Sequence, residues 1–226
     1  MVPCHILKRY RVMAKRKPKS NLKRNPSQRE PYDRILIVCE GEKTEPIYFK
    51  SLIDWYKINT ANVSIIGDCG SNPNSIFKKA KEEQKKNKHK NAYDKIFCVF
   101  DKDSHPDYLE TIALVNDSKN YKAIVSVPCF EYWVLLHFEY TDAPFSKTGS
   151  KSICDTVVKK LKVHLPDYQK SATNLVENAL LNNIDNAIKR SKKSTQSAEE
   201  RGSDNPSSNV HELVECLKHI KDRSVT

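Results

Sequence analysis

Short apolar runs alternate with amphipathic stretches over residues 34–140 of the sequence. Four runs rich in β-branched residues predict strands, at residues 35–39, 62–66, 95–100 and 122–127. The stretches that follow them predict helices, at residues 44–55, 74–88, 104–116 and 130–138. Runs that are apolar throughout are typical of strands buried on both faces, and regular strand–helix alternation is typical of a parallel sheet. We therefore expect an α/β fold with a parallel sheet of about four strands flanked by helices.

The pattern changes after Tyr140, where the strand signals disappear. Further helices are predicted at residues 151–164, 172–193 and 208–221. Between the last two, residues 194–208 are low in hydrophobicity and predict a flexible loop or lid. The sequence thus predicts a basic, mobile tail over residues 1–32, an α/β core over 33–140, and a C-terminal helical region over 141–226 that packs on the core.

The positive charge of the chain is concentrated in a few segments. The 226 residues carry a formal net charge of +11, which by itself favours a nucleic-acid partner. Residues 1–30, however, hold ten Lys or Arg against one acid, so the rest of the chain is close to neutral. We expect this tail to attract phosphates without sequence specificity, with a purely solubilising role as the alternative. Within the predicted core, residues 78–90 form the strongest basic patch, with seven lysines and two acids.

Residue spacing excludes several classes of site. The five glycines form neither a dinucleotide-binding GxGxxG motif nor a GxxxxGK phosphate-binding loop. The seven cysteines are widely spread, without the short pairings of a structural zinc site, and we expect no disulfides. No apolar stretch is long enough for a transmembrane helix or for the core of a signal peptide. We therefore expect a cytoplasmic protein with no membrane partner.

Four acidic residues follow the ends of predicted strands. Glu40 comes directly after the first strand, Asp101 and Asp103 follow the third, and Glu131 opens the helix after the fourth. In an open parallel sheet, ligands bind at the carboxyl ends of the strands, so we expect these acids to share one crevice. Such a cluster repels itself unless it is neutralised, and Mg²⁺ prefers oxygen ligands of this kind. The four together predict a metal site, whereas each acid alone is better explained by helix capping or the helix dipole.

Segments of this region resemble the RloB/AbiL family of phage-defence proteins, which have a Toprim-type core. They are ILIVCEGEKTE at residues 35–45, VFDKD at 99–103 and CFEYWVLLHF at 129–138. The segment NPSSNVHELV at 205–214 resembles the C-terminal motif of the same family. The resemblance spans residues 34–221 and implies a Toprim-like, Rossmann-like sheet with a C-terminal helical extension. Members of the family are often encoded beside an ATPase.

The resemblance also implies a function for the four acids. Glu40, Asp101 and Asp103 match the acids with which Toprim proteins bind Mg²⁺, with Mn²⁺ as the alternative ion. Glu131 lies in the family's CFE motif, where it is a catalytic candidate that orients or ligates. On this basis we expect Mg²⁺-dependent hydrolysis of phosphodiesters, with Glu40 as a candidate base. Lys43 is a candidate stabiliser of developing negative charge, and its alternative is a solvated lysine in a turn.

The expected partners are nucleic acid, either DNA or RNA with tRNA included, and an ATPase encoded nearby; a homo-oligomer is left open. The candidate phosphate contacts are Lys78, Lys79, Lys85 and Lys86, with a solvated helix face as the alternative. The resemblance favours a nuclease of an abortive-infection system. Two other functions stay open: a metal-binding regulatory or toxin subunit of an ATPase-containing complex, and a Toprim nucleotidyl transferase. His137, on an apolar helix, is interpreted as a hydrogen-bonded core residue.

Overall fold

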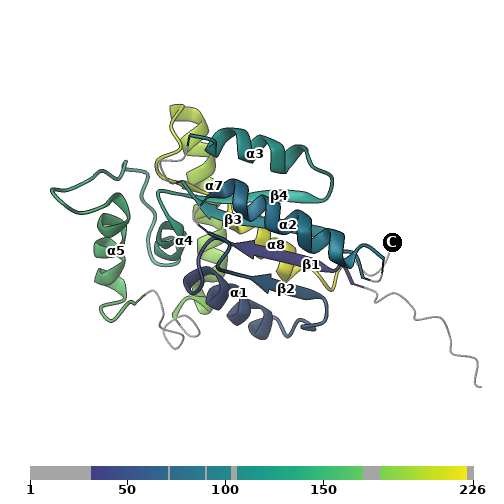
Figure 1. Cartoon of the computed structure of the whole chain (residues 1–226). Helices are drawn as coiled ribbons and strands as arrows, with labels where there is room; N and C mark the ends of the chain where they lie inside the picture. Colours follow the sequence, from purple (N-terminus) through teal and green to yellow (C-terminus); the bar gives the residue numbers. More distant parts are fainter. Residues whose placement is uncertain (1–31, 71, 90, 103–105, 170–178, 223–226) are drawn as a thin grey trace, which may run out of the picture. The chain divides into compact units, whose positions relative to one another are not determined.

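A computed structural model gives the structure of the chain (Figure 1). It describes residues 32–70, 72–89, 91–102, 106–169 and 179–222. The chain divides into two units, Met1–Glu30 and Pro31–Thr226, and the described residues all belong to the second. The tail predicted for residues 1–32 therefore lies, except for its last residue, outside the described part of the chain.

A five-stranded sheet forms the centre of the second unit. Its strands are β1 (Ile35–Cys39), β2 (Val63–Ile66), β3 (Lys95–Asp101), β4 (Tyr121–Val127) and β5 (Ser207–Ser208), in the order β2-β1-β3-β4-β5. The first four are parallel, and β5 pairs antiparallel with β4. This confirms the α/β class and is consistent with a Rossmann-like fold. The fifth strand corrects the expected number, because two serines carry no hydrophobic signal from which a strand could be predicted.

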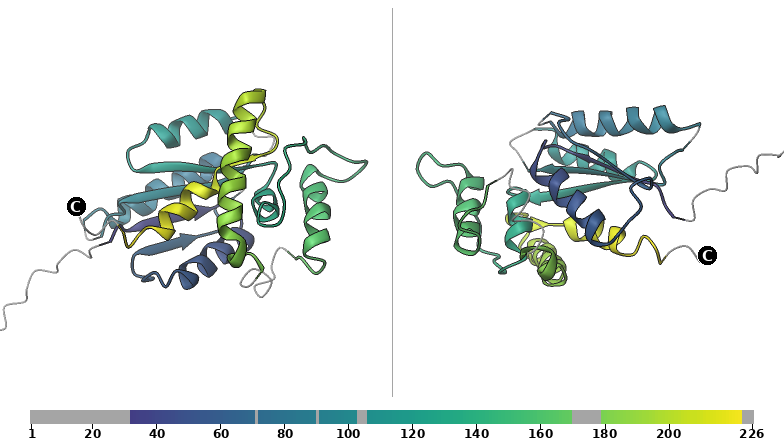
Figure 2. Two further views of the ribbon diagram at one scale, coloured as in Figure 1. Left: turned by 180° about the vertical axis from the view of Figure 1, so that it is seen from behind. Right: turned by 90° about the horizontal axis from the view of Figure 1, so that it is seen from below.

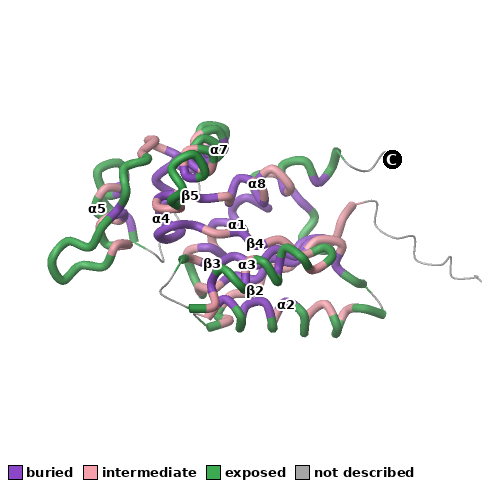
Figure 3. The backbone as a smooth tube through the Cα atoms, turned by 90° about the horizontal axis from the view of Figure 1, so that it is seen from above, coloured by how far each residue is buried: buried purple, intermediate pink, exposed green. Residues whose placement is uncertain are grey.

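Helices cover both faces of this sheet. They are α1 (Thr44–Trp55), α2 (Pro73–Asn87), α3 (Tyr108–Asp117), α4 (Phe130–Leu135), α5 (Ile153–His164), α7 (Ile184–Arg201) and α8 (Val210–Lys218), with a 3₁₀ turn, η1 (Leu181–Asn183), before α7. Figure 2 shows the helices on the two faces of the sheet. Alternate strand residues enter two apolar clusters, one with α2 and α3, the other with α1, α4 and the C-terminal helices. Strands β1 and β3 are consequently buried on both faces, whereas β2, at the edge of the sheet, is mostly half-buried (Figure 3). No helix in the described ranges is both long and apolar enough to cross a membrane.

Helix α4 is buried along its whole length and ends three residues earlier than the sequence predicts. The turn that follows contains His137, which is 1% exposed. Its Nδ1 donates to the Trp133 carbonyl at 3.1 Å, and its Nε2 accepts from the Tyr48 hydroxyl at 3.2 Å. This confirms the interpretation of His137 as a hydrogen-bonded core residue. Burial lowers the pKa of this imidazole to about 4, so the ring is neutral near pH 7.

The prediction of a flexible loop at residues 194–208 is wrong. Helix α7 continues through this segment to Arg201 and ends at Gly202, whose φ of 62° is a left-handed conformation that favours glycine. Ser191 and Ser194 lie on the buried side of the helix, where their hydroxyls donate to backbone carbonyl groups. Because a serine-rich helix face looks polar in the sequence, hydropathy alone misses this part of α7.

Asn209 joins the C-terminal region to the edge of the sheet. Its Oδ1 accepts from the Val125 N–H at 2.7 Å, and its Nδ2 donates to the Ala123 carbonyl at 3.1 Å. The side chain thereby takes the place of a neighbouring strand beside β4. At the next residue of β4, the hydroxyl of Ser126 forms a hydrogen bond of 3.0 Å with the hydroxyl of Ser208. The C-terminal region therefore docks on the sheet through defined polar contacts.

Candidate metal site at the carboxyl ends of β1 and β3

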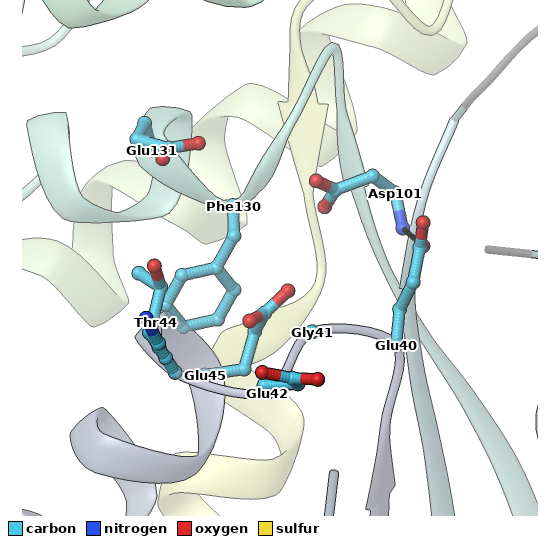
Figure 4. A pocket seen from close by; sticks show the side chains of 9 residues that line it. Glu40, Gly41, Glu42, Thr44, Glu45, Asp101, Phe130 and Glu131 are labelled. Carbon is cyan, nitrogen blue, oxygen red and sulfur yellow. Dashed lines mark hydrogen bonds between the residues drawn. The ribbon is translucent and has the colours of Figure 1, made fainter. Parts of the chain in front are cut away.

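The carboxyl ends of β1 and β3 meet where the chain changes direction across the sheet. Helix α1, which follows β1, packs on one face, whereas α3, which follows β3, packs on the other. Such a change of direction leaves a crevice, the usual ligand position in open α/β sheets. A pocket of about 440 Å³ opens here (Figure 4). Its lining residues are Glu40, Gly41, Glu42, Lys43, Thr44, Glu45, Asp101, Phe130 and Glu131.

Backbone hydrogen bonds fix Glu40 and Asp101 beside each other. The Glu40 N–H donates to the Val99 carbonyl at 3.0 Å, which extends the pairing of β1 with β3 by one residue. The carboxylate of Glu40 in turn accepts from the Asp101 N–H at 3.1 Å. Asp101 is the last residue of β3, so the strand runs one residue further than predicted. Two carboxylates that the sequence predicts at separate strand ends are therefore neighbours.

Asp101 lies in the electric field of other carboxylates. Burial raises the pKa of this carboxyl well above its usual value, and the negative charges of Glu45, Glu131 and Glu40 raise it further. A hydrogen bond from the backbone of Phe130 offsets part of this increase. The carboxylates of Asp101, Glu131 and Glu45 point toward the same space (Figure 4). Like charges brought together in a partly desolvated pocket are costly unless a proton or a cation neutralises them.

Glu45 belongs to this cluster, although the sequence places it only in the first turn of a helix. It is 7% exposed, and its carboxylate packs against Gly41 so closely that a Cβ atom on residue 41 would overlap it. A glycine at this position therefore leaves the room that the Glu45 side chain needs. The one signal in the sequence is its place in the segment ILIVCEGEKTE, at residues 35–45, which also carries Glu40. Nothing in the pattern predicts that a first-turn acid turns inward.

Glu131 enters the pocket from α4 and is 2% exposed. Its charge raises the pKa of Asp101 on one side and of Tyr168 on the other. Tyr168 lies in the turn after α5, and its hydroxyl is buried against Glu131. Sequence reasoning missed Tyr168, since one tyrosine in a helical region forms no recognisable motif. The site thus takes residues from the sheet core and from the C-terminal region.

The donor groups fit a hard divalent cation. They are carboxylate oxygens, which Mg²⁺ and Mn²⁺ prefer, and the raised pKa of Asp101 marks an excess of negative charge that a cation would neutralise. Within the described ranges, no three Asp, Glu, His or Cys side chains are arranged closely enough to hold one ion together. Asp103, the remaining predicted ligand, lies outside the described residues.

One lysine lines this acidic pocket. Lys43 is exposed and precedes α1 as its N-cap residue. Lys102 follows Asp101 but is not among the lining residues, and its Nζ lies 2.6 Å from Asp204 Oδ2. This ion pair ties the end of β3 to the segment before β5. A lysine beside a cation-seeking pocket suits an anionic ligand that binds together with a metal.

Helix α2 runs from the pocket side of the sheet to the opposite side. Near its beginning, the Asn74 side chain donates to Asp107, just before α3. Near its end, Gln84 exchanges two hydrogen bonds with the backbone of Tyr93, which precedes β3. A 15-residue helix is about 22 Å long, so its two ends lie near opposite edges of the sheet.

The four candidate phosphate contacts are spread along this helix. Lys78 and Lys79 lie in its first half, whereas Lys85 and Lys86 lie in its last turn, on the side away from the pocket. Lys79 and Lys86 also pair with Glu83, at 3.5 and 2.8 Å. The structure therefore separates the four into a pair nearer to the pocket and a pair further from it.

The fold and the pocket define an α/β protein with a candidate cation site at the direction change of its sheet. A family model described as RloB-like protein matches residues 35–217. The chain therefore belongs to the RloB-like family, which confirms the resemblance noted in the sequence. A search of curated proteins and a search of solved structures each found no match. Membership of this family is consistent with a role in defence.

Proposed function

We propose that the chain is a Mg²⁺-dependent nuclease that hydrolyses nucleic-acid phosphodiesters at a Toprim-type site, as part of an abortive-infection system. The observation that carries this proposal is the convergence of four carboxylates on one pocket, where burial and the other three charges raise the pKa of Asp101. A site of this composition stabilises a divalent cation and, through it, an anionic ligand. An ATPase encoded nearby is the proposed partner.

Each residue has a distinct role in this proposal. Glu40, Asp101 and Asp103 would hold Mg²⁺ or Mn²⁺, which when bound supplies Lewis-acid stabilisation of charge on a phosphate oxygen. Glu131 stays outside this ligand set and accepts the proton of the attacking water as general base, with Glu40 as the alternative base. Lys43 stabilises negative charge that develops at the rim of the pocket.

The substrate is proposed to be a polynucleotide rather than a mononucleotide. Lys43 lines the pocket, and Lys78 and Lys79 lie in the half of α2 nearer to the carboxyl edge of the sheet. Cations at more than one place along this edge favour a ligand with several phosphates. The backbone chemistry is shared by DNA and RNA, so the assay has to include both.

A cleavage assay tests this proposal. Purified protein is incubated with labelled RNA, tRNA and DNA, each with Mg²⁺ or with EDTA, alone and with the partner ATPase. We expect cleavage only with Mg²⁺, and a loss of about 100-fold or more in Asp101→Asn, which keeps the shape but removes the charge. Asp117→Asn, which removes an exposed aspartate at the end of α3, is the matched control. Equal cleavage by wild type and Asp101→Asn would overturn the proposal.

A regulatory or toxin subunit of an ATPase-containing complex is the second candidate. In that case the carboxylates of the pocket would hold a metal for a structural purpose, and the ATPase would supply the activity. Defence activity retained in a Glu40→Gln/Asp101→Asn double variant would support this function over hydrolysis. A nucleotidyl transferase would instead incorporate labelled nucleotide in the same reactions.

A further inference from the structure

Tyr168 combines burial with an unsatisfied polar group. The residue is 5% exposed and belongs to the apolar cluster that contains α1, α4 and the C-terminal helices. Its hydroxyl is buried and has no well-aligned hydrogen bond among the described residues. Leaving a buried hydroxyl without a partner is unfavourable, and a phenylalanine would fill the same space without this disadvantage. The hydroxyl therefore needs an explanation beyond packing.

The surroundings of the hydroxyl are those of the candidate site. It lies against Glu131, and the negative charges of Glu131 and Glu45 act on it. Burial raises the pKa of Tyr168 strongly, and these charges raise it further, so the phenol keeps its proton. A protonated phenol beside a carboxylate is a hydrogen-bond donor directed at that carboxylate.

We propose that Tyr168 is a positioning residue of the site: it donates to the carboxylate of Glu131 a hydrogen bond that already exists without ligand, and this bond holds the carboxylate in the pocket when substrate binds. This inference rests on the proposed function and adds a residue from outside the sheet core. Hydrogen bonds to catalytic groups are often long or poorly aligned before the ligand is bound, which fits the imperfect alignment here. The C-terminal region thereby completes the site instead of only covering the sheet.

The role has a specific energetic signature. If the hydroxyl acts through Glu131, removing it matters only while the Glu131 carboxylate is present. Tyr168→Phe should therefore lower kcat by about 10- to 100-fold and leave KM within about 2-fold, the size of effect seen when a group that orients a functional side chain is lost. In a Glu131→Gln background, Tyr168→Phe should have no further effect on kcat.

The experiment is a double-mutant cycle on Tyr168→Phe and Glu131→Gln, measured in the cleavage assay and in urea unfolding without metal. Tyr56→Phe is the matched control, because it also removes a buried hydroxyl without a partner, at the C-terminal end of α1 away from the pocket. We expect non-additive effects of the pair in both assays and no change of kcat in Tyr56→Phe. Additive effects in unfolding would overturn the contact, whatever the activity.

Two other outcomes separate this inference from the proposed function. Non-additivity in unfolding with an unchanged kcat in Tyr168→Phe would make the residue purely structural and overturn the positioning role. A wild-type protein that cleaves no more than Asp101→Asn would overturn the nuclease, while the unfolding cycle would still decide whether Tyr168 and Glu131 are coupled.

Discussion

Carboxylate side chains at the pocket lie where their negative charge is unfavourable. Asp101 lies among three other carboxylates, and Glu45 turns inward although a first-turn acid is stable in water. Arrangements of this kind lower the stability of the empty protein and are typical of functional sites. As a result, a substitution that changes a few atoms at the pocket should alter the stability or the activity of the protein.

Asp101→Asn should stabilise the protein in the absence of metal. The substitution removes a charge that Glu45, Glu131 and Glu40 oppose, so we expect the free energy of unfolding to rise by about 1 kcal/mol in EDTA. Urea denaturation measures this, and Asp117→Asn should change it by less than about 0.5 kcal/mol. With saturating Mn²⁺ the wild type should have the larger free energy of unfolding, because only the wild type gains stability from the ion. A destabilised variant in EDTA would contradict the repulsion.

Gly41→Ala and Gly67→Ala should separate function from stability. A Cβ on residue 41 would displace only the flexible end of Glu45, so we expect the free energy of unfolding to change by less than about 1 kcal/mol while metal-dependent activity falls at least about 10-fold. A Cβ on residue 67 would lie 2.6 Å from the Gly41 carbonyl oxygen and 2.9 Å from Pro46 Cγ. The backbone would have to move, which costs about 1–3 kcal/mol. Thermal unfolding and the cleavage assay together test the pair; full activity in Gly41→Ala would remove Glu45 from the site.

His137 should make the fold sensitive to acid. Its pKa is about 4 in the folded protein and near 6.5 when unfolded, so the unfolded state binds a proton first as the pH falls. The stability that the neutral ring contributes is complete above about pH 6.5 and is lost progressively toward pH 4, by up to about 3 kcal/mol. Urea unfolding between pH 7 and 5 should show this loss in the wild type and a smaller slope in His137→Gln. His219→Gln, at an exposed site, should keep the wild-type slope.

At the scale of secondary-structure elements, orientation decides which residues can act together. Helices α1, α2 and α3 each follow a parallel strand, so each begins at the carboxyl edge of the sheet and returns toward the opposite edge. The sequence identified the basic helix but treated its lysines as one patch. Only the direction of α2 shows that Lys78 and Lys79 lie nearer to the edge that carries Asp101 than Lys85 and Lys86 do.

Paired substitutions on α2 should therefore have unequal effects. In Lys78→Ala/Lys79→Ala we expect nucleic-acid affinity to fall about 3- to 10-fold and the salt dependence of binding to become shallower by about one to two ions. Lys85→Ala/Lys86→Ala should change affinity by less than about 2-fold. Fluorescence anisotropy with Asp101→Asn protein and labelled strands at several salt concentrations measures both. Equal losses in the two variants would place the bound strand along the whole helix instead.

At the scale of the molecule, the sequence predicted what hydrophobic periodicity encodes. Strands β1 and β3 are built on continuous apolar runs, and Glu40 and Asp101 lie where those runs end. Prediction from hydrophobic periodicity failed where polar residues are buried. The hydroxyls of Ser191 and Ser194 donate to backbone carbonyl groups inside the protein. Because these residues look polar in the sequence, the C-terminal part of α7 was predicted as a loop. Glu45 is turned inward by its contact with Gly41, which no local pattern records.

In the whole molecule, the sheet core and the C-terminal region contribute different groups to the site and its surroundings. The sheet core carries the acids, while the C-terminal region contributes Tyr168, the Lys102–Asp204 ion pair and the contacts of Asn209 to β4. These contacts join segments that lie far apart in the sequence, so no local signal could have placed them. The family match over residues 35–217 spans both parts, as expected if they form one functional unit.

The most direct test of the central claim is anomalous diffraction from crystals of the full chain soaked in Mn²⁺. The account predicts an anomalous peak in the pocket, within coordination distance of Glu40 and Asp101, and no peak there in Asp101→Asn crystals grown and soaked in the same way. A pocket without anomalous density at saturating Mn²⁺, in crystals where the wild-type carboxylates are well ordered, would contradict the metal site and the chemistry that depends on it.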